Sequence, residues 1–160
     1  MSGMKKILVT GSKGFIGKNL VSHLDGHELY GLDSEYLVYS DWKERLINIL
    51  EGFSADVIFH VGACSSTLEK DVNFMMIRNY ESTKVLTDWC KTNEVPVVYS
   101  SSAASYGVNN LYPSNLYGWS KYVAEDYVLA NGGLALRYFN VYGPGEEEKG
   151  KMASIAYQSY

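Results

Sequence analysis

Short apolar runs alternate along this chain with segments of helical periodicity. The runs lie at residues 7–9, 29–33, 57–61, 95–100 and 134–138 and are typical of buried parallel strands. Between most of them, apolar residues recur three and four positions apart, as in helices that bury one face. This alternation predicts an α/β fold in which helices connect the strands of a parallel sheet.

The helical segments are expected at residues 42–50, at residues 74–93 and in a helix that opens near Tyr117. Gly52 is expected to end the first helix, and a Gly-Gly pair at 132–133 the last. Residues 37–39 are interpreted as a very short further strand, which gives six strands in all. The predicted fold class is a Rossmann-type, doubly wound parallel sheet with helices on both faces.

Three glycines follow the first apolar run, at positions 11, 14 and 17. A strand that turns sharply into a helix needs a glycine at the turn. A second glycine lets a diphosphate approach the backbone, and a third allows close packing of helix on strand. The start of the helix then offers amide donors and a partial positive charge. The pattern favours a dinucleotide site, although its spacing is one residue wider than the usual fingerprint.

A carboxylate, Asp33, ends the second apolar run about twenty residues after the glycine turn. A carboxylate accepts hydrogen bonds from both hydroxyls of an unmodified ribose and repels a 2′-phosphate. Asp33 therefore predicts NAD as the cofactor. Lys13, inside the glycine turn, could reach a 2′-phosphate and leaves NADP as the alternative.

Small residues follow the run at 57–61 and leave room for a ligand at the carboxyl end of a central strand. Gly62, Ala63, Cys64 and Ser65 form this segment. His60, within the run itself, is interpreted as a hydrogen-bonded core residue rather than a base.

Tyr117 and Lys121 stand four positions apart on a predicted helix, and therefore on one face. A tyrosine hydroxyl titrates near pH 10 unless a neighbouring cation stabilises the phenolate, and Lys121 is such a cation. A serine from the Ser-rich segment at 100–102 could share a substrate oxygen with this tyrosine. The combination indicates an acid/base site beside the cofactor.

Composition limits the classes of partner. With 160 residues, the chain is long enough for one domain with its own core. Its 14 basic and 18 acidic residues show no basic face for nucleic acid, and no apolar run approaches the length of a membrane span. We therefore expect a cytoplasmic protein. Its two cysteines predict neither a disulfide framework nor a metal site.

Taken together, these motifs resemble the extended short-chain dehydrogenases/reductases of the nucleotide-sugar epimerase and dehydratase group. Within that group, three segments resemble the ADP-glycero-manno-heptose 6-epimerases. They are His-Val-Gly-Ala-Cys-Ser-Ser-Thr at 60–67, Ser-Ser-Ala-Ala-Ser-Tyr-Gly at 101–107, and Arg-Tyr-Phe-Asn-Val-Tyr-Gly-Pro at 137–144, which is followed by Lys-Gly-Lys-Met-Ala-Ser at 149–154.

The resemblance implies a set of site residues. The catalytic set is Ser102, Tyr117, Lys121 and a second acid/base, Lys149. The cofactor set is Gly11, Gly14, Phe15, Ile16, Gly17, Asp33, Gly62, Ala63, Asn79 and Lys121. Cys64, Ser65 and Asn140 are expected to contact a nucleotide-sugar substrate, and no metal is expected.

Members of this family continue for well over a hundred further residues, which supply most of the sugar-nucleotide pocket. We therefore expect an NAD-binding domain at residues 1–138 and only the start of a substrate region at residues 139–160, with the C-terminal substrate domain largely absent. The leading hypothesis is a heptose 6-epimerase that oxidises a carbinol carbon and returns the hydride to its other face. A cofactor-binding fragment without catalysis, and a nucleotide-sugar 4-epimerase or dehydratase, remain alternatives. A homo-oligomer is left open. The isolated chain is expected to bind NAD without epimerising a heptose nucleotide, and its tail to be mobile.

Overall fold

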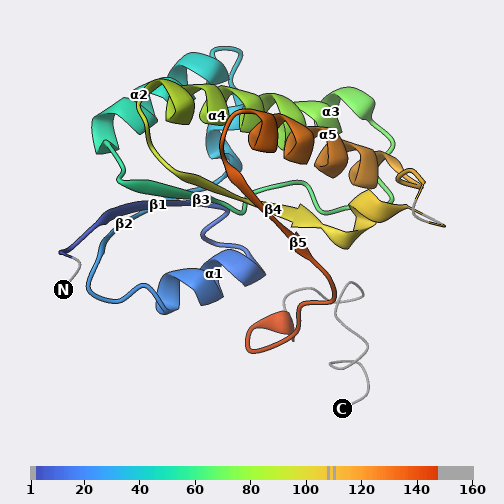
Figure 1. Ribbon diagram of the computed structural model, residues 1–160, viewed down its shortest axis with the longest axis horizontal. Helices are drawn as coiled ribbons and strands as arrows, with labels where there is room; N and C mark the ends of the chain where they lie inside the picture. Colours follow the sequence, from blue (N-terminus) through green and yellow to red (C-terminus); the bar gives the residue numbers. More distant parts are fainter. Residues whose placement is uncertain (1–2, 108, 110, 148–160) are drawn as a thin grey trace.

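The computed structural model describes residues 3–107, 109 and 111–147, and within them a five-stranded parallel sheet (Figure 1). The strands are β1 (Lys6–Thr10), β2 (Glu28–Leu32), β3 (Val57–His60), β4 (Val97–Ser102) and β5 (Leu134–Tyr138). Their order across the sheet is β2-β1-β3-β4-β5. Since β1 pairs with β2 on one side and β3 on the other, the strand order reverses at β1, where open α/β sheets bind ligands.

The helices cover the two faces of the sheet unequally. Figure 1 shows α1 (Phe15–Ser22) alone on one face, and on the other α2 (Trp42–Phe53), α3 (Val72–Met76), α4 (Ser82–Thr92) and α5 (Leu116–Ala130). Helices therefore lie on both faces, as predicted. However, Leu134 and Leu136 of β5 are exposed in the described part of the chain.

The hydrophobic core lies between the sheet and the four-helix face. Leu8, Ile58 and Tyr99 project into it from β1, β3 and β4, and each is nearly fully buried. Leu46, Leu50, Leu86 and Val128 meet them from the helices, on the apolar faces that their helical spacing predicts. This packing holds the carboxyl ends of the central strands in fixed positions beside the helix N-termini.

The strand predicted at residues 37–39 is absent, so the six-strand expectation was wrong. A 3₁₀ helix, η1 (Ser34–Val38), follows β2 instead. Tyr36 and Leu37 pack from this turn against the core, which satisfies their apolar character without a sheet partner. A run of three residues is too short to decide between the two structures.

Several element boundaries also differ from the prediction. Helix α2 passes through Gly52 and ends at Phe53, and Ser54, with φ 53°, adopts the left-handed conformation that terminates it. Strand β4 begins two residues later than predicted and extends to Ser102, which brings its serines into the sheet.

The long helix predicted at residues 74–93 is interrupted. Between α3 and α4, the segment η2 (Ile77–Glu81) is a π-helical turn. The Ser82 amide donates to the Ile77 carbonyl, five residues back. A π turn inserts one extra residue and so rotates the side chains that follow it, and such turns are frequent at functional sites.

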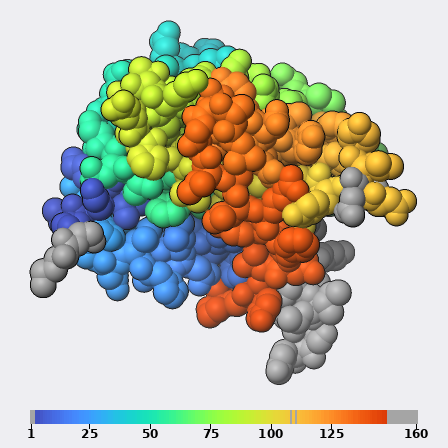
Figure 2. Space-filling view, in the orientation of Figure 1, coloured from blue at the N-terminus to red at the C-terminus, as the bar shows by residue number. Residues whose placement is uncertain are grey.

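After β5 the chain returns to α1. The Asn19 side-chain amide donates to the Pro144 carbonyl at 3.0 Å, and Figure 2 shows the segment after β5 lying against the segment that contains α1. Glu146 is 1% exposed. Glu146 is therefore packed within the protein, whereas most of the tail that is predicted to be mobile lies outside the described residues.

Candidate cofactor and active site

The glycine turn between β1 and α1 is close-packed around its three glycines. Gly11 has φ +67°, and a Cβ on it would lie 2.6 Å from the Gly62 Cα. A Cβ on Gly17 would lie 2.0 Å from the Gly11 carbonyl oxygen. Neither position accepts a side chain. Gly14 immediately precedes α1 and leaves the helix N-terminus open to an anionic group.

Asp33 lies directly beside this turn. Its carboxylate accepts hydrogen bonds from the Ser12 hydroxyl at 2.7 Å and from the Lys13 amide at 3.1 Å. The Lys13 ammonium bends away to Glu35, with a nitrogen-to-oxygen distance of 2.6 Å, and lies 3.9 Å from Asp33. This hydrogen bond to Glu35 raises the pKa of Lys13. The one cation in the turn is therefore already paired with a carboxylate.

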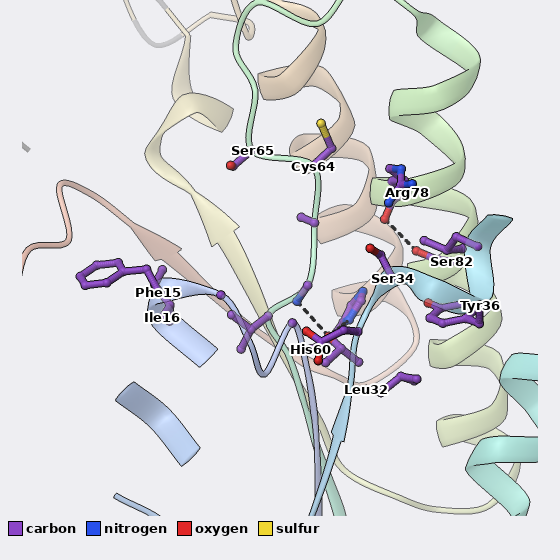
Figure 3. Close-up of a pocket in the computed structure, with 18 of the residues that line it drawn as sticks. Phe15, Ile16, Leu32, Ser34, Tyr36, His60, Cys64, Ser65, Arg78 and Ser82 are labelled. Carbon is purple, nitrogen blue, oxygen red and sulfur yellow. Dashed lines mark hydrogen bonds between the residues drawn. The ribbon is translucent and has the colours of Figure 1, made fainter. Parts of the chain in front are cut away.

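A cavity of about 540 Å³ opens at the carboxyl ends of β1, β2 and β3 (Figure 3). Its lining includes the predicted residues Gly11, Gly14, Phe15, Ile16, Asp33, Gly62, Ala63, Cys64 and Ser65. In Figure 3, Phe15 and Ile16 lie at one side, whereas Ser34, Tyr36, Ser82 and Arg78 gather at the other. The sequence motifs at the ends of β1, β2 and β3 therefore converge on one cavity.

The Asn79 side chain holds the loop after β3 in place through hydrogen bonds to its backbone. Its side-chain oxygen accepts from the Cys64 amide at 2.7 Å, and its amide group donates to the Cys64 carbonyl at 2.9 Å and to the Ser120 hydroxyl at 2.9 Å. It is 1% exposed and does not line the cavity. Gly17 likewise lies behind the cavity wall. Both support the cofactor site from behind, and their assignment as cofactor contacts stays a prediction.

His60 is a hydrogen-bonded core residue, as the sequence indicated. Its two ring nitrogens bond the Thr10 and Thr83 hydroxyls at 2.7 and 2.8 Å. Burial, together with the nearby Lys121 charge, lowers the pKa of His60 to about 3. The ring is therefore neutral at physiological pH and is unsuited to act as a base there.

Ser102 and Tyr117 come together at the carboxyl end of β4. Burial raises the pKa of Tyr117 above its usual value, and a hydrogen bond with Ser102 opposes that rise only in part. The Cys64 thiol also acts on Tyr117 and raises its pKa further. Cys64 lines the cavity, whereas Tyr117 is not one of the lining residues. This pKa rise is opposite to the lowering that the Tyr/Lys spacing predicted.

Lys121 explains the difference. Its ammonium donates to the Ser100 carbonyl at 2.7 Å and lies 4.8 Å from the centre of the Tyr99 ring. No carboxylate pairs with it in the part of the chain described here. Burial lowers the pKa of Lys121 to about 7. A substantial fraction of the Lys121 side chains is therefore uncharged at neutral pH, and an uncharged amine does not stabilise a phenolate. Lys121 is not among the causes that shift the pKa of Tyr117, so their partnership stays a prediction.

A buried ion pair supports the end of β4 from behind. Arg137 of β5 donates to Glu125 of α5 at 2.6 Å, and Glu125 also accepts from the Ser101 hydroxyl. Burial raises the pKa of Glu125, but the hydrogen bonds from Arg137 and Ser101 outweigh it and leave that pKa below its usual value. The pair fixes Ser101, and with it the neighbouring Ser102.

One predicted residue lies apart from this constellation, and another belongs to the part of the chain that is not described. Asn140 is exposed after β5 and does not line the cavity, and Lys149 lies outside the described residues. Sequence reasoning missed several cavity residues, among them Tyr36, Phe74, Arg78 and Ser82. Phe74, Arg78 and Ser82 recur at intervals of four, and this spacing was the available signal. Within the described residues, no cluster suited to a metal ion is present, and no helix is long and apolar enough to cross a bilayer.

Comparison with known proteins identifies the family of this chain. Residues 7–159 match the model of the NAD dependent epimerase/dehydratase family. The chain belongs to that family. Its fold class and the nucleotide-sugar group predicted from the motifs are thereby confirmed, and the family is NAD-dependent as its name states.

Two solved structures carry the comparison further. The ADP-L-glycero-D-manno-heptose-6-epimerase of Helicobacter pylori superposes with a TM-score of 0.83 at 29% identity, covering 97% of this chain and 61% of that one. MoeE5, solved with UDP-glucuronic acid and NAD, superposes with a TM-score of 0.71 at 27% identity, covering 88% and 56%. The chain therefore spans about three fifths of the length of these relatives.

Proposed function

We propose that this chain binds NAD and carries the acid/base residues of a nucleotide-sugar epimerase. The observation that carries the proposal is the position of Tyr117. Ser102 and the Cys64 thiol both act on the pKa of its phenol, and Cys64 lines the cavity that starts at the glycine turn. We infer that the proton-transfer site meets the cofactor site at Cys64.

The residues at the cavity fit an adenine dinucleotide. The glycine turn leaves no side chain between the α1 N-terminus and the cavity, and Asp33 presents its carboxylate beside it. The pairing of Lys13 with Glu35 removes the nearest cation that a 2′-phosphate could use, which favours NAD over NADP. When bound, the nicotinamide would accept a hydride from a carbinol carbon and return it.

The chain's own residues would handle the proton. The Tyr117 phenol would exchange a proton with the oxygen on the reacting carbon, and the Ser102 hydroxyl would hold that oxygen by a hydrogen bond. The raised pKa of Tyr117 keeps the phenol protonated at neutral pH, so a proton is available for the reduction direction. For the opposite direction, a charged Lys121 one turn along α5 would have to lower it. Lys149, as the second acid/base, stays a prediction.

A heptose nucleotide is the substrate that we favour. The support is the likeness to the Helicobacter pylori enzyme over 97% of this chain and the three sequence segments shared with that epimerase group. The likeness to MoeE5, a UDP-glucuronic acid complex, keeps a different nucleotide sugar as the second candidate. The same cofactor residues are expected for both candidate substrates. Measured turnover of each nucleotide sugar must therefore distinguish them.

The cofactor half of the proposal is tested by titrating NAD and NADP into the 160-residue chain. We expect saturable NAD binding, weaker binding of NADP, and loss of affinity for NAD in Asp33→Ala. Arg45→Ala is the matched control, because Arg45 bonds Asp41 on the surface of α2 and does not line the cavity. An unmodified chain that binds neither dinucleotide would overturn the proposal.

The catalytic half is tested with the protein as expressed from its native reading frame. Incubation with NAD and an ADP-glycero-manno-heptose should interconvert the two configurations at carbon 6, which NMR of the sugar follows directly. Tyr117→Phe should reduce turnover by about a hundredfold or more while leaving NAD affinity nearly unchanged, since only the proton-transfer oxygen is lost. A fully active Tyr117→Phe protein would exclude this tyrosine from the mechanism.

A further inference from the structure

Arg78 lines the cavity beside the glycine turn and has no carboxylate partner among the described residues. The chain has three arginines, and the other two are bound by carboxylates, Arg45 by Asp41 and Arg137 by Glu125. Within the described residues, the Arg78 guanidinium makes neither an ion pair nor a side-chain hydrogen bond. A guanidinium left unpaired in a cavity is available to a ligand.

The position of this guanidinium is nevertheless fixed. Its central carbon lies 4.4 Å from the centre of the Phe74 ring, one helical turn earlier. Its backbone carbonyl accepts from the Ser82 hydroxyl at 2.8 Å, one turn later. The π-helical turn η2 aims Arg78 into the cavity while the next residue, Asn79, points beneath the loop after β3. The cation–π contact with the Phe74 ring restricts the positions that the guanidinium can adopt.

The neighbours of Arg78 indicate which part of a dinucleotide would lie there. Its charge acts on Tyr36, which belongs to the 3₁₀ turn immediately after Asp33. Figure 3 shows Ser34, Tyr36, Ser82 and Arg78 grouped on the same side of the cavity. If Asp33 binds the adenosine ribose, the base attached to that ribose lies between the turn η1 and the turn η2.

The chemistry of this end of the cavity favours a planar, uncharged ring over a phosphate. Asp33 is the one carboxylate that lines the cavity among the described residues, and it would repel a second anion held nearby. Burial raises the pKa of Tyr36 to about 12, so its hydroxyl stays neutral. Leu32 and Leu37 add apolar walls. A guanidinium stacks on an aromatic face without needing an opposite charge.

We propose that Arg78, supported by Phe74, forms the platform on which the adenine ring stacks. The inference rests on the proposed NAD site and extends it to a residue that determines how tightly the adenosine half is held. Arg78 is thus a binding residue for the base, whereas Asp33 binds the ribose of the same half.

The test uses ADP-ribose and its 2′-phosphorylated form as probes, with calorimetric titration of the 160-residue chain. Arg78→Ala should weaken ADP-ribose binding by about tenfold or more, the size expected when a stacking partner of a base is removed. Arg78→Lys should weaken it almost as much, because lysine keeps the charge and loses the plane. Phe74→Leu should weaken it to a smaller extent.

Two controls separate binding from folding. Arg78→Ala should keep the thermal midpoint of the unmodified chain, since no hydrogen bond or ion pair of the guanidinium is removed. Arg45→Ala, which removes an arginine that lies 4.0 Å from the centre of the Tyr39 ring outside the cavity, should leave ADP-ribose affinity unchanged.

Three outcomes would overturn the inference and leave the NAD site standing. They are wild-type affinity for ADP-ribose in Arg78→Ala, wild-type affinity in Arg78→Lys, and a loss that is much larger for the 2′-phosphorylated probe. The third outcome would show that Arg78 binds the 2′-phosphate and not the adenine ring. If the unmodified chain binds neither NAD nor ADP-ribose, the proposed function itself fails.

Discussion

At the scale of single residues, we expect a pair of side chains at the surface to influence the choice between NAD and NADP. Lys13 lies in the glycine turn, and its ammonium is 2.6 Å from Glu35. An exposed pair of this kind contributes little to stability, but it determines where the lysine charge is available. While Lys13 is paired with Glu35, its charge is not available to a 2′-phosphate. A Lys13 released from Glu35 could attract that phosphate.

Glu35→Gln should strengthen NADP binding by roughly two- to fivefold and leave NAD affinity nearly unchanged, because Lys13 is released from a surface pair. Parallel titrations of the two cofactors measure the ratio. The double variant with Lys13→Gln is the control and should lose the gain. An NADP affinity that does not change in Glu35→Gln would show that Lys13 cannot reach the phosphate.

Lys121 is expected to titrate near neutral pH in the chain without ligand. Burial lowers its pKa from 10.5 to about 7, whereas the unfolded chain keeps the ordinary value. Between pH 7 and 10.5 the unfolded state binds the extra proton, so this residue makes the fold more stable as the pH rises through that window. NMR of chains with labelled lysine side chains should show one resonance that titrates near 7 and is missing in Lys121→Met. A spectrum in which every lysine titrates near 10 would contradict this.

At the scale of elements, two features fix the site. The π-helical turn η2 turns Arg78 toward the cavity, and Asn79 ties the loop after β3 to α5 through Ser120. On the other side, the Glu125 and Arg137 pair joins α5 to β5 and bonds Ser101 at the end of β4. The packing of α5 against β4 and β5 therefore contributes to the positions of Ser102 and Tyr117.

Glu125→Ala should lower the free energy of unfolding by about 2–4 kcal/mol, since it leaves the Arg137 guanidinium and the Ser101 hydroxyl without their acceptor. Urea denaturation measures the change. Arg45→Ala, which breaks an exposed pair on α2, should cost less than about 1 kcal/mol and serves as the matched control. Equal costs for the two variants would show that the buried pair contributes no more than a surface one.

At the scale of the whole molecule, the buried core makes stability depend on pH. His60 sits between β1 and α4, bonded to Thr10 and Thr83, with its pKa lowered to about 3. In the unfolded chain its pKa is the ordinary 6.5, so between these values the unfolded state binds the extra proton. Folding is therefore less favourable as the pH falls from 6.5 toward 3.

Lowering the pH from 7 to 5 should reduce the free energy of unfolding by about 2 kcal/mol through His60 alone, at about 1.4 kcal/mol per pH unit below 6.5. Denaturation curves of the unmodified chain and of His60→Gln separate this contribution from that of the carboxyl groups. The variant should be less stable at pH 7 and should show a shallower slope. Parallel slopes would mean that His60 is protonated in the folded chain.

The sequence by itself determined the alternation of strands and helices, the glycine turn with Asp33, and the Ser102, Tyr117 and Lys121 motif. These follow from local periodicity and from spacings along the chain, which a sequence contains directly. It also identified His60 as a core residue, because a lone histidine in an apolar strand needs hydrogen-bond partners.

Only the tertiary structure decided the rest. Residues 37–39 became part of a 3₁₀ turn since packing of Leu37 on the core replaced strand pairing, and the π turn at Arg78 arose within a segment that reads as ordinary helix. The pKa of Tyr117 moved against the expected direction and the pKa of Lys121 fell, because burial is a property of the folded surroundings that residue spacing does not contain.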